Sequence, residues 1–81
     1  MNTIVVPYEK YEAFKEDIEA WLKTRGKGTA RYGGKAGEVT HWLGVDDWCY
    51  YTQWDTERIV ESTVFLFRKE EDAVEFALRF A

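Results

Sequence analysis

The hydrophobic spacing of this sequence changes along the chain, and these changes restrict the fold more than any other feature. Residues 8–24 place apolar side chains at helical intervals, and residues 70–80 do the same. Strand-like runs, rich in aromatic or β-branched residues and bounded by polar turns or Pro7, occupy residues 3–6, 39–45, 48–54 and 58–67. The sequence therefore predicts the order β-α-β-β-β-α.

This order predicts one α+β domain over residues 1–81, with an antiparallel sheet and two helices packed on one of its faces. Four Trp, five Tyr and five Phe in 81 residues can fill a small core. Pro7 suits the start of the first helix, and Gly26 or Gly28 suits a left-handed residue at its end. The buried helical stripes would be Tyr11, Phe14, Ile18, Trp21 and Leu22, followed by Ala73, Phe76, Ala77 and Phe80.

Two-residue turns between the strands would sort their side chains onto two faces. We expect the more aromatic face to lie under the helices, and it comprises Leu43, Val45, Trp48, Tyr50, Trp54, Ile59, Phe65 and Phe67. The opposite face comprises Trp42, Cys49, Tyr51, Gln53, Val60, Ser62, Val64 and Leu66. It is too apolar for water, and we expect an exposed patch that binds a second copy or another protein. Two alternatives stay open: a register slip would exchange the faces, and the glycine-rich segment could fold over the second face.

Charge is distributed unevenly. The net charge of −4 argues against nucleic-acid binding, yet residues 20–37 carry +5, which leaves −9 for the rest of the chain. Five glycines within residues 25–38 predict a loop of functional importance or high mobility. Its cations, which could bind an acidic or phosphate-bearing partner, are Arg25, Lys27, Arg31 and Lys35. The glycine spacing fails the phosphate-loop pattern, because Gly34 stands where a lysine is needed.

Acidic residues form two surfaces. The spacing of Glu9, Glu12, Glu16 and Glu19 places all four on one face of the first helix. The second surface comprises Glu70, Glu71, Asp72 and Glu75. Such rows of carboxylates could imitate a nucleic-acid backbone and occupy the cleft of a DNA-binding protein, although an ordinary solvated helix face is the better explanation of the first row.

Groups able to perform chemistry are few. His41 and Cys49 are the only residues of their kinds, and the expected register points them to opposite faces. Asp46 and Asp47 could hold a hard cation, but paired aspartates are common in turns. We therefore expect no catalytic residue, no metal and no cofactor. A single cysteine suits a reducing compartment, and the N-terminal apolar run is too short for a signal peptide or a membrane span, which predicts a cytoplasmic protein.

The segment from Phe65 to Phe80 resembles the ends of many small proteins of large tailed bacteriophages. The shared pattern is an aromatic strand, an acidic Asp72-Ala73 helix start and the ending Phe76-Ala77-Leu78-Arg79-Phe80. The resemblance implies a phage protein that acts on its bacterial host, in the host cytoplasm, and carries over no site residue.

The leading hypothesis is a non-enzymatic protein that inhibits or modulates a host or bacterial-defence protein by contact. Its expected contact residues are Trp42, Tyr51, Arg25, Lys27, Arg31, Lys35, Glu12 and Glu16. The alternative is an oligomeric binder of nucleotides or other anions that uses the basic segment 25–35. A minor subunit of a phage assembly is a third interpretation.

Overall fold

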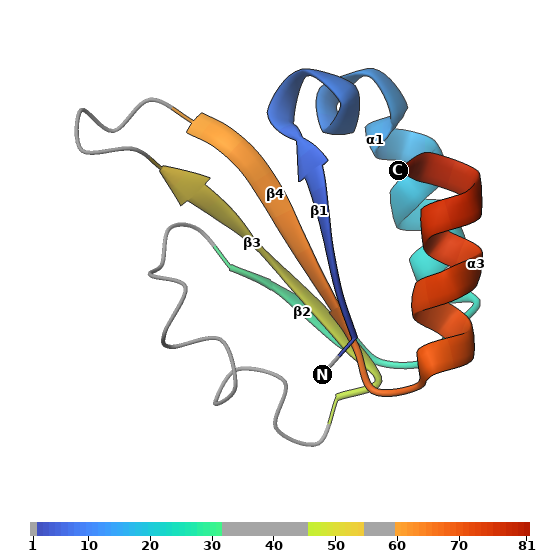
Figure 1. Cartoon of the computed structure of the whole chain (residues 1–81). Helices are drawn as coiled ribbons and strands as arrows, with labels where there is room; N and C mark the ends of the chain where they lie inside the picture. Colours follow the sequence, from blue (N-terminus) through green and yellow to red (C-terminus); the bar gives the residue numbers. More distant parts are fainter. Residues whose placement is uncertain (1, 32–45, 55–59) are drawn as a thin grey trace.

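A four-stranded sheet and two helices make up the described part of the chain, which in this computed structural model comprises residues 2–31, 46–54 and 60–81 (Figure 1). The elements are β1 (Asn2–Pro7), α1 (Tyr8–Lys23), β2 (Gly28–Arg31), β3 (Trp48–Trp54), β4 (Val60–Phe67) and α3 (Glu70–Phe80). The predicted α+β class is confirmed, and the described elements follow the predicted order only approximately.

The sheet has the strand order β1-β4-β3-β2 and is mixed rather than antiparallel. β4 pairs antiparallel with both β1 and β3, whereas β2 runs parallel to β3. β2 lies inside the segment that we predicted as loop, so that prediction is wrong for Gly28–Arg31. Its four residues show no apolar alternation, and only their pairing with β3 makes them a strand. The strand predicted at 39–45 lies outside the described residues.

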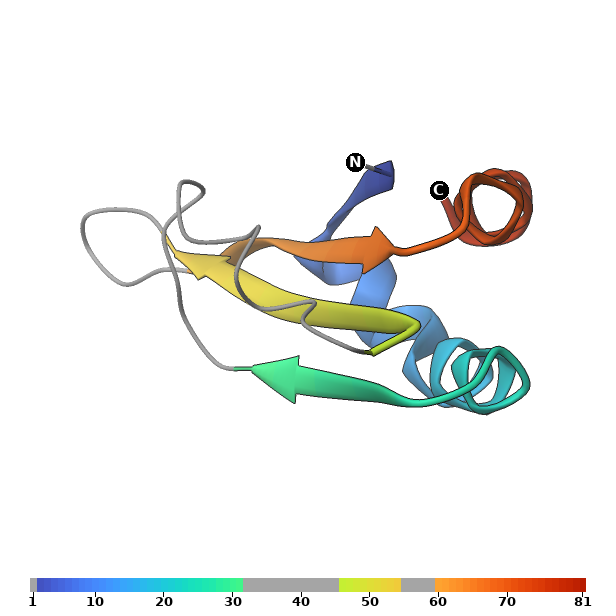
Figure 2. The ribbon, with the colours of Figure 1, turned by 90° about the horizontal axis from the view of Figure 1, so that it is seen from below.

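Both helices pack on the sheet face that was predicted to lie beneath them. Trp48, Tyr50, Phe65 and Phe67 contact a core that contains Tyr11 and Trp21 from α1 and Phe76 and Phe80 from α3, among others. Phe76 lies at its centre, with its ring centroid 4.5 Å from that of Phe65 and 5.2 Å from that of Phe67. Figure 2 shows α3 on the side of β1 and β4, and the end of α1 toward β2. The core therefore joins both helices to the two central strands.

The opposite sheet face differs from our expectation of an exposed patch. Cys49, Tyr51, Val64 and Leu66 form a second cluster of buried side chains, and Tyr51 is only 2% exposed. The register is not slipped there, since Trp48 pairs with Phe67 and Tyr50 with Phe65. An irregularity between Gln53 and Trp54 comes too late in β3 to exchange the faces. The patch prediction is thus wrong at these four residues, because burial within the single chain removes their apolar surface from water. Trp42 and the side chains of Gln53 and Val60 lie outside the described residues.

Helix α1 departs from helical geometry at Phe14, where φ is −115° and ψ is 16°. The predicted stripe is buried at its other four members, but Phe14 is 44% exposed. In α3, Ala73, Phe76 and Phe80 are buried as expected and Ala77 is half-buried. Asp72 is also buried, although we predicted it as part of an acidic surface.

Gly26, in the connection that follows α1, has the left-handed backbone conformation that the sequence suggested, with φ at +101°. A Cβ at this position would lie 2.0 Å from Oδ2 of Asp47, so both the backbone angle and the space demand glycine. This close approach brings the start of β2 against the residues that precede β3.

Candidate functional site

Arg25, one of the four cations predicted to bind a partner, is used within the fold. Its guanidinium carbon lies 4.8 Å from the centroid of the Trp21 ring. Its Nη1 lies 3.8 Å from Oδ1 of Asp72, and its Nη2 forms an ion pair with Glu75. Arg25 therefore stacks on Trp21 of α1 and joins the end of α1 to α3 by charge. Its one positive charge is shared by two acids of the second predicted acidic surface.

Lys27 and Tyr51, two further predicted contact residues, differ in exposure. Lys27 is exposed, and its main-chain N–H donates to Oδ2 of Asp47 at 3.1 Å. Tyr51 is buried, and this burial raises the pKa of its hydroxyl, with a further contribution from Cys49. Trp42, Lys35 and the side chain of Arg31 lie outside the described residues.

Asp46 and Asp47 serve as a junction between strands. The hydroxyl of Thr29 donates to Oδ2 of Asp46 at 2.8 Å, and Arg68 donates through Nε to the carbonyl oxygen of Asp46 at 3.0 Å. The main-chain N–H of Asp47 donates to the carbonyl oxygen of Lys27 at 2.8 Å. These bonds connect the start of β2, the start of β3 and the end of β4. Each of the two carboxylates thus accepts a protein donor through its Oδ2 atom.

Within the described ranges, no three or more His, Cys, Asp or Glu side chains are grouped so as to hold a metal ion. Cys49 is buried, and His41 lies outside those ranges, so the predicted separation of the two stays a prediction.

An open groove lies between α1 and the end of α3. We call it the Phe14 groove. It has a volume of about 550 Å³ and is lined by Phe14, Asp17, Ala20, Trp21, Thr24, Arg79 and Phe80. Trp21 and Phe80 meet edge to face, with ring centroids 6.1 Å apart. The Nε1–H of Trp21 is buried and has no acceptor among the described residues. The groove therefore has aromatic walls, with Asp17 and Arg79 among its polar lining residues.

Acidic side chains border Phe14. Glu12, Glu16 and Asp17 are exposed and line a second hollow that Phe14 shares. The hydroxyl of Tyr8 donates to Oε1 of Glu12 at 2.5 Å, which orients that carboxylate. Two of the predicted contact residues, Glu12 and Glu16, thus lie beside an exposed aromatic ring. The surface can offer a basic partner an apolar anchor with three carboxylates beside it, and Lys15 and Arg79 line the same two hollows.

Beneath this surface, α1 is held to the sheet by Tyr11. Burial raises the pKa of Tyr11, and its hydrogen bond with Tyr50 and the charges of Glu19 and Glu12 act in the same direction. The neutral phenol is therefore the form that the fold favours.

Sequence reasoning missed Phe14 as a surface residue. Its spacing from Tyr11 and Ile18 matches a regular buried stripe, and neither Gly nor Pro occurs nearby to indicate a break. The backbone leaves helical geometry at Phe14 and the ring is exposed there. No local sequence signal predicts this departure.

Comparison of the chain with protein-family models, with curated proteins and with solved structures finds no match in any of the three. Among the described helices, none is long and apolar enough to cross a membrane.

Proposed function

We propose that this chain is a non-enzymatic binding protein that inhibits or modulates another protein by direct contact through the Phe14 groove. The exposure of Phe14 at the irregular point of α1 carries the proposal. A large aromatic ring in an open groove, with acidic neighbours, has the composition of an interface anchor.

The exposure of Phe14 supports this assignment. At Phe14 the backbone of α1 leaves helical geometry and the ring is 44% exposed, so much of its apolar surface stays in water in the single chain. A partner that covers the ring would recover the hydrophobic free energy, about 1 kcal/mol or more.

The chemistry of the border indicates the kind of partner. Glu12, Glu16 and Asp17 favour a protein whose apolar pocket has a basic rim. The resemblance of the C-terminal segment to phage proteins directs the search to a host or bacterial-defence protein. An anion ligand at the basic segment is less well supported, because Asp72 and Glu75 already neutralise Arg25.

Affinity capture from bacterial lysate with quantitative mass spectrometry tests the proposal. Phe14→Ser should reduce the captured partner by roughly tenfold or more, the loss typical of an interface anchor. Leu78→Ser is the matched control, because it removes an apolar side chain that is 85% exposed on another surface. Circular dichroism verifies that both variants are folded. Equal capture by Phe14→Ser and the parent chain, or repeated failure to capture any protein, would overturn the proposal.

A further inference from the structure

β1 forms one edge of the described sheet. Its six residues pair with β4 in an unbroken register from Asn2↔Phe67 to Pro7↔Ser62. Within the described strands nothing pairs with its other side. A strand in this position presents a row of unpaired N–H and C=O groups that another strand can bind.

Two of the devices that commonly protect an edge strand, charged side chains and bulges, are missing from β1 itself. Asn2 to Val6 includes no charged residue and no bulge, and Pro7 comes only at the end. Val5 shares a face with its partner Val64 but is 56% exposed. The opposite edge, β2, has only four residues and ends in Arg31, which makes it a poorer template. The two edges therefore differ in their capacity to pair.

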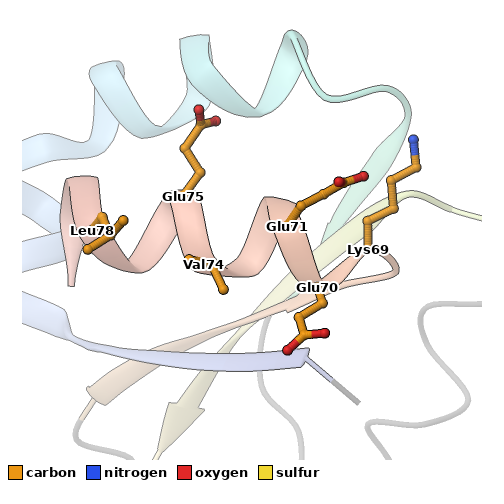
Figure 3. Close-up of a pocket in the computed structure, with 6 residues that line it drawn as sticks. All are labelled: Lys69, Glu70, Glu71, Val74, Glu75 and Leu78. Carbon is orange, nitrogen blue, oxygen red and sulfur yellow. The ribbon is translucent and has the colours of Figure 1, made fainter.

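The flank of α3 that lies toward β1 is also uncovered. Figure 3 shows Glu75 pointing toward α1, whereas Val74 and Glu70 point toward β1. Val74 is 51% and Leu78 is 85% exposed, and their spacing of four residues places them one turn apart. Both line a hollow along α3 together with Lys69, Glu70, Glu71 and Glu75. Because α3 packs on β1 and β4, and Val74 points toward β1, this apolar flank lies on the β1 side of α3 (Figure 3).

We propose that the β1 edge and the outer flank of α3 together form a dimerisation surface for a second copy of this chain. The two β1 strands pair antiparallel about a two-fold axis, which makes one continuous sheet across both copies. An uncharged strand is complementary to itself in this arrangement, since no like charges oppose one another along it.

The same axis brings the two α3 helices together. Strands in a sheet lie about 4.8 Å apart, so helices seated over the β1–β4 pair of each copy would lie about 10 Å apart. Packed helices are separated by about 8–10 Å, so the two flanks would meet with Val74 and Leu78 between them. The antiparallel arrangement also places Glu70 of one copy toward the C-terminal end of the other helix, away from its own counterpart.

The size of this contact sets the expected affinity. One six-residue strand and one helix flank per copy are near the lower limit of about 1,000 Å² of total buried area for a specific interface. We therefore expect a dissociation constant of about 1–100 μM. This surface is separate from the Phe14 groove, so it goes beyond the function proposed above and can fail independently of it.

Sedimentation velocity of the full chain, from about 1 to about 300 μM, tests the dimer. Val5→Lys places a charge on the edge, and Val74→Ser with Leu78→Ser removes the apolar flank. Each change should raise the dissociation constant at least about tenfold. Phe14→Ser is the matched control and should leave it unchanged. Hydrogen exchange of the β1 amides should also slow as protein concentration rises.

Four results would overturn the proposal: a strict monomer over this range, a dimer that the flank variant leaves intact, a dimer that the edge variant leaves intact, or a dimer that Phe14→Ser disrupts. If Val5→Lys does not fold, the flank variant, whose changes are on an exposed helix surface, and the exchange of the β1 amides decide the question.

Discussion

The inner and outer sides of the helix layer carry similar apolar residues but use them differently. On the inner side, Trp21 and Phe76 are buried in the aromatic core, and Arg25 closes the space between the helices. On the outer side, Phe14 and Leu78 belong to the same two helices yet face solvent.

This difference shows that the fold depends on one set of residues and the proposed contacts on another. The inner residues hold the helices on the sheet, so their burial stabilises the single chain. The outer residues contribute little to the stability of the single chain, because they stay exposed unless another molecule covers them. Substitutions on the two sides should therefore separate stability from association.

The largest effect is expected for Phe76→Ala on the inner side. The Phe76 ring lies 4.5–5.5 Å, centroid to centroid, from those of Phe65, Phe67, Phe80 and Trp21. Its loss should lower the free energy of unfolding by about 3–5 kcal/mol, enough to threaten folding in a domain of this size. Urea denaturation followed by tryptophan fluorescence measures the change, and Phe76→Leu should cost clearly less. A loss below about 1 kcal/mol would show that the inner side is not the main source of stability.

Arg25→Ala should have the next largest effect, because it leaves the buried carboxylate of Asp72 without its cation. We expect the free energy of unfolding to fall by about 1–3 kcal/mol. The effect is smaller than for a fully buried pair because Arg25 and Glu75 are partly exposed. Adding Asp72→Asn to Arg25→Ala should restore part of the loss, and Arg79→Ala provides a control on α3. If Arg25→Ala unfolds at the same urea concentration as the parent chain, the ion pair does not stabilise the contact between the helices.

Alkaline pH should lower the free energy of unfolding through ionisation of Tyr11 on the inner side. Its pKa is raised in the folded state, so the stabilising effect is complete below the ordinary tyrosine pKa of about 10 and is lost as pH rises above it. The urea midpoint of the parent chain should fall between about pH 9 and 11 more steeply than that of Tyr11→Phe. Parallel decreases for the two proteins would contradict a shifted Tyr11.

The smallest effect is expected for Leu78→Ser on the outer side. At concentrations where the chain is monomeric, its free energy of unfolding should change by no more than about 0.5 kcal/mol, because the side chain is 85% exposed. Thermal and urea denaturation of dilute protein measure this. A loss above about 1 kcal/mol would mean that Leu78 packs within its own chain, which would remove the contrast between the two sides.

The elements with strong periodicity were predictable. The segment proposed for α1 matches Tyr8–Lys23, and that for α3 matches Glu70–Phe80. Phe65 and Phe67 were placed correctly under the helices, because alternation along a strand assigns faces without knowledge of the partner. The candidate site was predicted less well: Glu12 and Glu16 are exposed as expected, but Arg25 and Tyr51 point inward.

The amino-acid sequence by itself determined the fold class, the two helices and which side chains of β3 and β4 share a face, since these follow from local preference and the period of apolar residues. Only the tertiary structure decided that Gly28–Arg31 becomes a strand beside β3, that Arg25 turns toward α3 and that Phe14 faces solvent. Each of these depends on groups distant in the sequence or on a backbone departure that no nearby residue indicates. The proposed binding surfaces follow from this packing, because they consist of the side chains and the strand edge that the helices and strands leave exposed.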